Sequence, residues 1–211
     1  MKKIAISVFA ALISLGAAPS QAIDFGKLPS LGNKGGSAGA GASAAEVAKN
    51  TRNALVAFTA AELGLLEALG GYDKLTAMQK QVEGMQKGDA GVNTDQLQAA
   101  VDIHKSASAE IDKKLAENAK LDAGQKTLAA KSMAAYVQGL VSTRQTLSSL
   151  QGLAKNPLSL GSDAGPVLFA VKELPGMVSG GVSTTGTLFK YLGANGVDLH
   201  DAKSAADTMP K

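Results

Sequence analysis

Three ionisable side chains occupy positions where a helix should present apolar residues to a core: Glu62, His104 and Arg144. At 100° per residue, each falls within a stripe of large apolar residues. An isolated buried charge is very costly, so such groups are paired, hydrated or neutral. Because arginine offers a planar fork to a carboxylate, we expect Glu62 to pair with Arg144 and His104 to be hydrogen-bonded nearby. Helices of alternating direction would place the three positions within roughly two turns of one another.

This polar trio has three interpretations. In the first interpretation it is an internal ion pair with a hydrogen-bonded histidine that serves only the fold, as buried pairs often do. Alternatively, one of the three residues faces solvent at the edge of the helices. In the third interpretation the trio is a polar anchor inside an apolar cavity, the usual arrangement of a ligand site. Glu62 and Arg144 would then orient a head group, while Tyr136 and His104 would add donors or acceptors.

The sequence offers little other chemistry. Its two histidines, His104 and His200, belong to no H-x-x-x-H or H-E-x-x-H pair, whereas a catalytic zinc needs three protein ligands at characteristic spacing. Asp198, His200 and Asp201 form either an adventitious metal cluster or, as charged runs usually do, a solvated tail. Haem bound through His104 alone is conceivable, but without cysteine covalent attachment is excluded. We therefore predict no catalytic residue, metal or cofactor, and we lean against an enzyme.

Four helical stretches are expected to position the trio. Each has local start or stop signals, such as a capping box in which a side-chain acceptor is followed three residues later by Glu or Gln. Gly70-Gly71 is expected to end the first helix and Asn156-Pro157 the fourth. The expected helices are 44–69 (Ser43 with Glu46), 73–87, 93–120 (Asn93 with Gln96, and Val92 stapled to Leu97) and 122–155 (Asp122 with Gln125).

The composition changes after residue 157, where glycine and proline become frequent. We expect a short helix over 166–173, which opens at a proline. The following sixteen residues, Leu174 to Phe189, carry no charge. Within them Gly176, Gly180 and Thr184 recur at four-residue spacing, which lets helices approach closely. This segment is a glycine-rich helix or helix–loop buried on the other helices, a movable lid, or an apolar surface that meets lipid or protein. Residues 198–208 are expected to form a last helix.

The N-terminus has the layout of a cleavable secretory signal over residues 1–22. Lys2 and Lys3 precede thirteen uncharged residues, Ile4 to Gly16, and small residues lead to an expected cleavage after Ala22. The apolar run is shorter than the roughly 20 residues of a spanning helix. Residues 23–43 are a short apolar start and a Gly/Ser/Ala-rich flexible linker, leaving 44–211 as one domain.

Charge and composition narrow the class of protein. Removal of the signal leaves 19 Lys and Arg against 18 Asp and Glu, a net charge of +1, which gives no electrostatic case for nucleic acid. No Cys or Trp is present, and the Ala-, Leu-, Lys- and Gln-rich composition favours helix. We therefore predict an all-α fold, an antiparallel four-helix bundle with the glycine-rich C-terminal segment packed on it.

The sequence supports two functions for a periplasmic protein of this kind, without a transmembrane span in the mature chain. The first is a non-enzymatic binding protein for a small, partly apolar ligand such as a lipid, held at Glu62, His104, Tyr136 and Arg144. The second is an interaction or assembly component of the envelope, in which the polar trio is purely structural and the 174–189 segment is a docking face.

Overall fold

The computed structural model describes residues 44–71, 75–87, 93–155, 160–161 and 164–209. These residues form six helices and no strand, which confirms the all-α prediction for the part described. The predicted signal peptide, the linker 23–43, Ser43, Val92 and the Asn156-Pro157 stop lie outside the described residues. The helices are α1 (Ala44–Ala68), α2 (Leu75–Lys87), α3 (Thr94–Glu117), α4 (Ala123–Ala154), α5 (Ala164–Ala194) and α6 (His200–Asp207).

Local sequence signals set several of these boundaries. Gly70 takes the left-handed conformation, with φ of 79°, and the amides of Gly70 and Gly71 donate to the carbonyls of Glu67 and Leu66 to end α1. The Asn93 side chain accepts from the Gln96 amide at the start of α3. At α4, Asp122 and Gln125 form the reciprocal capping box predicted for this helix.

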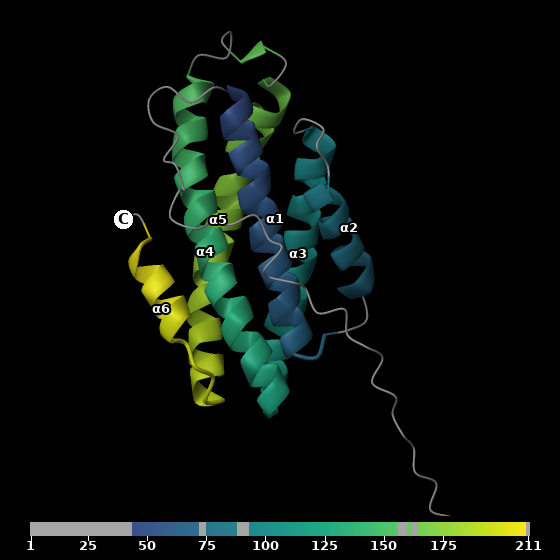
Figure 1. Ribbon diagram of the computed structural model, residues 1–211, viewed down its shortest axis with the longest axis vertical. Coiled ribbons are helices and arrows are strands. Elements are labelled where there is room, and N and C mark those ends of the chain that lie inside the picture. The colour runs from purple at the N-terminus through teal and green to yellow at the C-terminus, as the bar shows by residue number, and fades with distance from the viewer. Residues whose placement is uncertain (1–43, 72–74, 88–92, 156–159, 162–163, 210–211) are drawn as a thin grey trace, which may run out of the picture.

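Helix α1 is central, and this explains why its buried stretch is largely apolar, with Thr59, Glu62 and Glu67 as the polar exceptions. All residues from 54 to 69 are buried. It packs against α2, α3, α4 and α5, while α3 and α4 also contact α5, and α6 lies on α4. In Figure 1, α1, α3 and α5 run in one direction and α2, α4 and α6 in the other. The residues around Glu62 are therefore enclosed by neighbouring helices.

Helices α1 and α4 approach each other closely at Gly139. A Cβ atom at this position would lie 2.8 Å from the Phe58 Cα atom and 3.1 Å from its backbone nitrogen. Backbone cannot yield as the end of a flexible side chain can, so only glycine fits without a shift of a helix. This contact fixes the position of α4 along the axis of α1. It therefore also fixes which side chains of the two helices lie at the same height.

Helix α5 corrects the prediction of a separate short helix over 166–173. A single helix of 31 residues runs through Pro175, which removes one helical hydrogen bond at a cost of about 3 kcal/mol. The helix remains continuous because its buried stripe extends on both sides of the proline, from Val167 and Leu174 to Met177 and Leu188. The C-terminal end is fixed further by Tyr191, whose hydroxyl donates to the Ala119 carbonyl at 2.6 Å.

The sequence predicts no transmembrane span in the mature chain, and the length and hydropathy of the helices bear on this prediction. Among the residues described, none of the helices combines enough length with enough apolar character to cross a bilayer.

Candidate functional site

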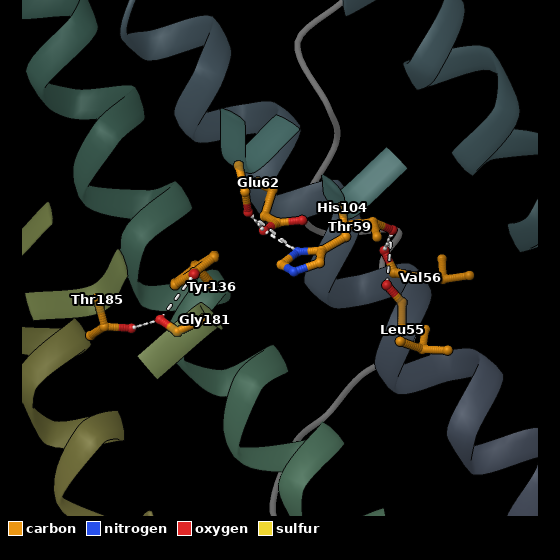
Figure 2. A network of polar contacts seen from close by, with 9 residues as sticks. Leu55, Val56, Thr59, Glu62, His104, Tyr136, Gly181 and Thr185 are labelled. Atoms are coloured by element: carbon orange, nitrogen blue, oxygen red, sulfur yellow. Dashed lines mark hydrogen bonds and ion pairs between the residues drawn. The ribbon is translucent and has the colours of Figure 1, made fainter. Parts of the chain in front are cut away.

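The centre of the domain holds a carboxylate–imidazole pair between α1 and α3. Glu62 is completely buried and His104 is 6% exposed. The His104 Nδ1 atom lies 2.7 Å from Glu62 Oε1, and the Ser108 hydroxyl donates to the same oxygen at 3.3 Å (Figure 2). The contact with Glu62 uses Nδ1, so the other ring nitrogen, Nε2, takes no part in it.

The Glu62 carboxyl group is poorly solvated by its surroundings. Burial raises its pKa above the ordinary value of 4.5, although the His104 hydrogen bond, the charge of His104 and the Ser108 hydrogen bond all oppose the rise. Its second oxygen, Oε2, is buried and has no hydrogen-bond partner. Such an orphaned oxygen is a costly feature, which proteins retain for strain, function or a bound group.

The arrangement differs from that of a serine hydrolase. In a Ser–His–acid triad the serine and the acid bind opposite nitrogens of the imidazole. Here Ser108 Oγ lies 3.5 Å from His104 Nδ1, on the same side as Glu62. The ring therefore cannot take the Ser108 proton at Nε2, and the pair orients His104 rather than activating a nucleophile.

An aromatic layer connects this pair to α4 and α5. The Phe58 ring lies between those of His104 and Tyr136, with centroid distances of 5.4 and 4.9 Å. The Tyr136 hydroxyl donates to the Gly181 carbonyl at 3.1 Å, and the Thr185 hydroxyl donates to the same oxygen at 2.7 Å (Figure 2). Burial first, and the Glu62 charge second, raise the pKa of Tyr136. Tyr136 is therefore a neutral donor committed to α5.

Arg144 does not join this group, which corrects the expected Glu62–Arg144 pair. Glu62 is bonded instead to His104 and Ser108, and Arg144 is only partly buried. Since Gly139 meets Phe58 in antiparallel helices, Arg144 lies near the level of residue 53, about 14 Å along the axis from Glu62. Sequence reasoning found Glu62, His104 and Tyr136 but missed Gly181 and Thr185, whose only signal is small size.

His104 also reaches the outer side of the α3–α5 seam. In the described residues no hydrogen bond is formed by Nε2, and a Cβ atom on Gly180 would lie 3.9 Å from it. The side chain keeps 7% exposure. Figure 2 shows this second ring nitrogen turned away from Glu62. An oriented imidazole nitrogen thus lies beneath the outer face of α5.

That outer face is uncharged and made of small residues. Between Lys172 and Lys190 its exposed residues are uncharged and mostly small, with Val182 as a larger apolar side chain among them. Cβ atoms at Gly176 and Gly186 would meet no described residue within 4 Å. We call this surface the α5 face. It comprises Pro175, Gly176, Ser179, Gly180, Val182, Ser183, Gly186 and Thr187, all of them exposed.

An open cleft of about 340 Å³ lies elsewhere, between α2 and α3, and none of the predicted ligand residues lines it. Its walls combine two carboxylates and several neutral side chains: Met78, Gln81, Asp95, Gln98, Ala99, Asp102, Ile103 and Ser106.

The C-terminal acidic and histidine residues form a helix start. The Asp198 carboxylate accepts from the His200 amide at 3.0 Å at the beginning of α6. Across the described part of the chain, no three His, Cys, Asp or Glu residues are grouped so as to hold a metal ion.

Fold and site together describe an all-helical protein with a buried carboxylate–imidazole pair. Comparison of the chain with protein-family models, with curated proteins and with solved structures gave no match.

Proposed function

We propose that this protein is a non-enzymatic interaction component of the bacterial envelope, and that it docks a partner protein on the α5 face. The observation that carries the proposal is the exposure of Gly176, Gly180 and Gly186 in the middle of a helix. A glycine at such a position costs about 1 kcal/mol relative to alanine.

The folding of this chain does not require those glycines. Gly139 and Gly181 are needed internally, because a Cβ atom on either would lie within 3 Å of an atom of a neighbouring helix. At Gly176 and Gly186 the corresponding space is open. An uncharged strip of glycines and mostly short side chains allows another backbone to approach closely, which is how small residues serve helix packing. Docking of a partner would therefore explain why the chain keeps these destabilising glycines, which its own folding does not explain.

Photo-crosslinking in envelope preparations tests this proposal. A photoreactive residue at Ser183 on the α5 face is expected to give a defined crosslinked product, whereas one at the exposed Gln138 of α4 gives none. Gly176→Leu should abolish the product by filling the strip. Gly152→Leu is the matched control, since Gly152 is also an exposed helical glycine with open space. Equal yields from all these proteins would overturn the proposal.

The cellular location and the exact helical architecture belong to the same proposal. Export to the periplasm is supported by the signal layout of residues 1–22. The mass of the purified protein should then correspond to a chain that begins at Ile23. A four-helix bundle of α1, α3, α4 and α5, flanked by α2 and α6, is supported by the mutual contacts of these helices. The bundle would therefore include α5 and exclude α2.

A second candidate function, binding of a small and partly apolar ligand such as a lipid, is favoured by one observation. Glu62 Oε2 is a buried acceptor without a partner, close to His104 and one aromatic ring away from Tyr136. Native mass spectrometry and lipid extraction of the mature protein test this function. No copurified ligand, together with unchanged binding in Glu62→Gln, would exclude it.

A further inference from the structure

The α5 face and His104 meet at Gly180. Two independent observations coincide there: a strip of small residues on α5, and a histidine of α3 that is 94% buried with Nε2 directed at that strip and unpartnered. The imidazole is held by Glu62 through Nδ1, so the position and direction of Nε2 are fixed. The missing side chain at Gly180 leaves room for an approaching group.

We infer that the partner is a helix of a different protein, which lies along the α5 face and forms a hydrogen bond between a hydroxyl or amide side chain and His104 Nε2. The inference rests on the proposed docking function and specifies its partner. The partner group must be uncharged because the surrounding strip is uncharged, and it must be short because Nε2 lies just beneath the surface.

The charges at the ends of the strip determine which helix fits. Lys172 and Lys190 are eighteen residues apart, five full turns, so both lie on the same line of α5, about 27 Å from each other. Glu173 is paired with Lys172 at 3.6 Å and with Lys105 at 3.8 Å, which leaves one positive charge at that end. Both ends of the strip are therefore positive.

A second copy of this chain is a poor occupant. If two α5 faces were apposed, in parallel or antiparallel orientation, a lysine end would meet a lysine end, and like charges oppose association. The complementary helix instead carries acidic residues about five turns apart, with small uncharged residues between them. This pattern commits the proposal to a heterologous partner.

The test uses the Ser183 crosslink in the full chain with four further substitutions. His104→Asn keeps a donor near Nδ1 for Glu62 but removes Nε2, and the yield should fall about fivefold, the value of one hydrogen bond. His104→Gln, which retains a polar atom near Nε2, should recover part of it. Gly180→Ala puts a methyl group 3.9 Å from Nε2 without touching the Glu62 bond, and it should lower the yield more than Gly186→Ala, which adds the same bulk where no described neighbour lies within 4 Å. This pair keeps the test valid if His104→Asn folds poorly.

The outcomes separate the inference from the docking function. If the yield is unchanged in His104→Asn and falls no further in Gly180→Ala than in Gly186→Ala, the hydrogen bond is disproved while docking on α5 stands. If the product contains two copies of this chain, detected with copies of two lengths, the heterologous partner is disproved. Raising salt from about 50 to 500 mM should weaken a product formed with acidic ends. The absence of any product overturns docking itself.

Discussion

Glycines occur in this protein in two opposite settings, and the contrast separates what the fold needs from what it does not. At the α1–α4 contact, Gly139 lies against the Phe58 backbone, where a Cβ atom would be 2.8 Å from Cα. On the outer side of α5, Gly176 and Gly186 face open space. The first setting lets two helices of the same chain touch. In the second setting the same residue type has no neighbour among the described residues, and we attribute it to a partner protein.

The largest expected effect on stability comes from a substitution at the contact between Gly139 and Phe58. Gly139→Ala should lower the free energy of unfolding by about 3 kcal/mol, because the added methyl group must displace helical backbone rather than a side-chain end. Urea denaturation followed by circular dichroism measures this. Gly152→Ala, on the same helix but in open space, is the control and should be slightly stabilising. A stability of Gly139→Ala equal to that of the natural protein would show that α1 and α4 are less closely apposed.

The next effect concerns the buried pair. His104→Leu should cost about 2 kcal/mol, because it leaves the Glu62 carboxyl group, already without a partner at Oε2, dependent on Ser108 alone. His104→Asn should cost less, since an amide donor replaces Nδ1–H. Chemical denaturation of both variants gives the comparison. Equal costs would mean that the Glu62 hydrogen bond contributes little to the fold.

These two regions also show how far the sequence alone could lead. The helix ends at Gly70 and Asp122 are local, because a turn or a capping box needs only a few adjacent residues, and both predictions are confirmed. The stripe pattern likewise identified Glu62 and His104 as residues of a core. Their pairing was not predictable, because it depends on the level of one helix against another.

The axial position of one helix against another is set by contacts between helices, which the residue pattern of a single helix does not reveal. Arg144 has the better chemistry for Glu62, but the Gly139–Phe58 contact holds it about 14 Å away along the axis. The continuity of α5 through Pro175 has a similar cause. Local rules place a break at a proline, and the buried residues on both sides of it, Leu174 and Met177, outweigh that preference.

A smaller effect on stability, of opposite sign, is expected from a substitution on the α5 face. Gly186→Ala should raise the free energy of unfolding by about 1 kcal/mol, because it restricts the unfolded chain and its methyl group meets no neighbour. The same substitution should reduce the Ser183 crosslink if a partner backbone approaches there. A variant that is more stable yet docks less well would separate the requirements of folding from those of binding. Stabilisation without any loss of crosslinking would remove Gly186 from the docking surface.

The smallest effect is the pH dependence contributed by Glu62. Its pKa in the folded protein is raised above 4.5, so between these two values the folded state binds more protons than the unfolded state. The contribution of Glu62 to stability is therefore greatest below pH 4.5 and declines as the pH rises through the folded value. Glu62→Gln removes this titration. The stability of the natural protein minus that of Glu62→Gln should decrease from pH 4 upward, as measured by urea denaturation at constant salt. An increase with pH would mean that His104 stabilises the carboxylate more strongly than burial penalises it, and the orphaned Oε2 atom would then be less costly than its burial implies.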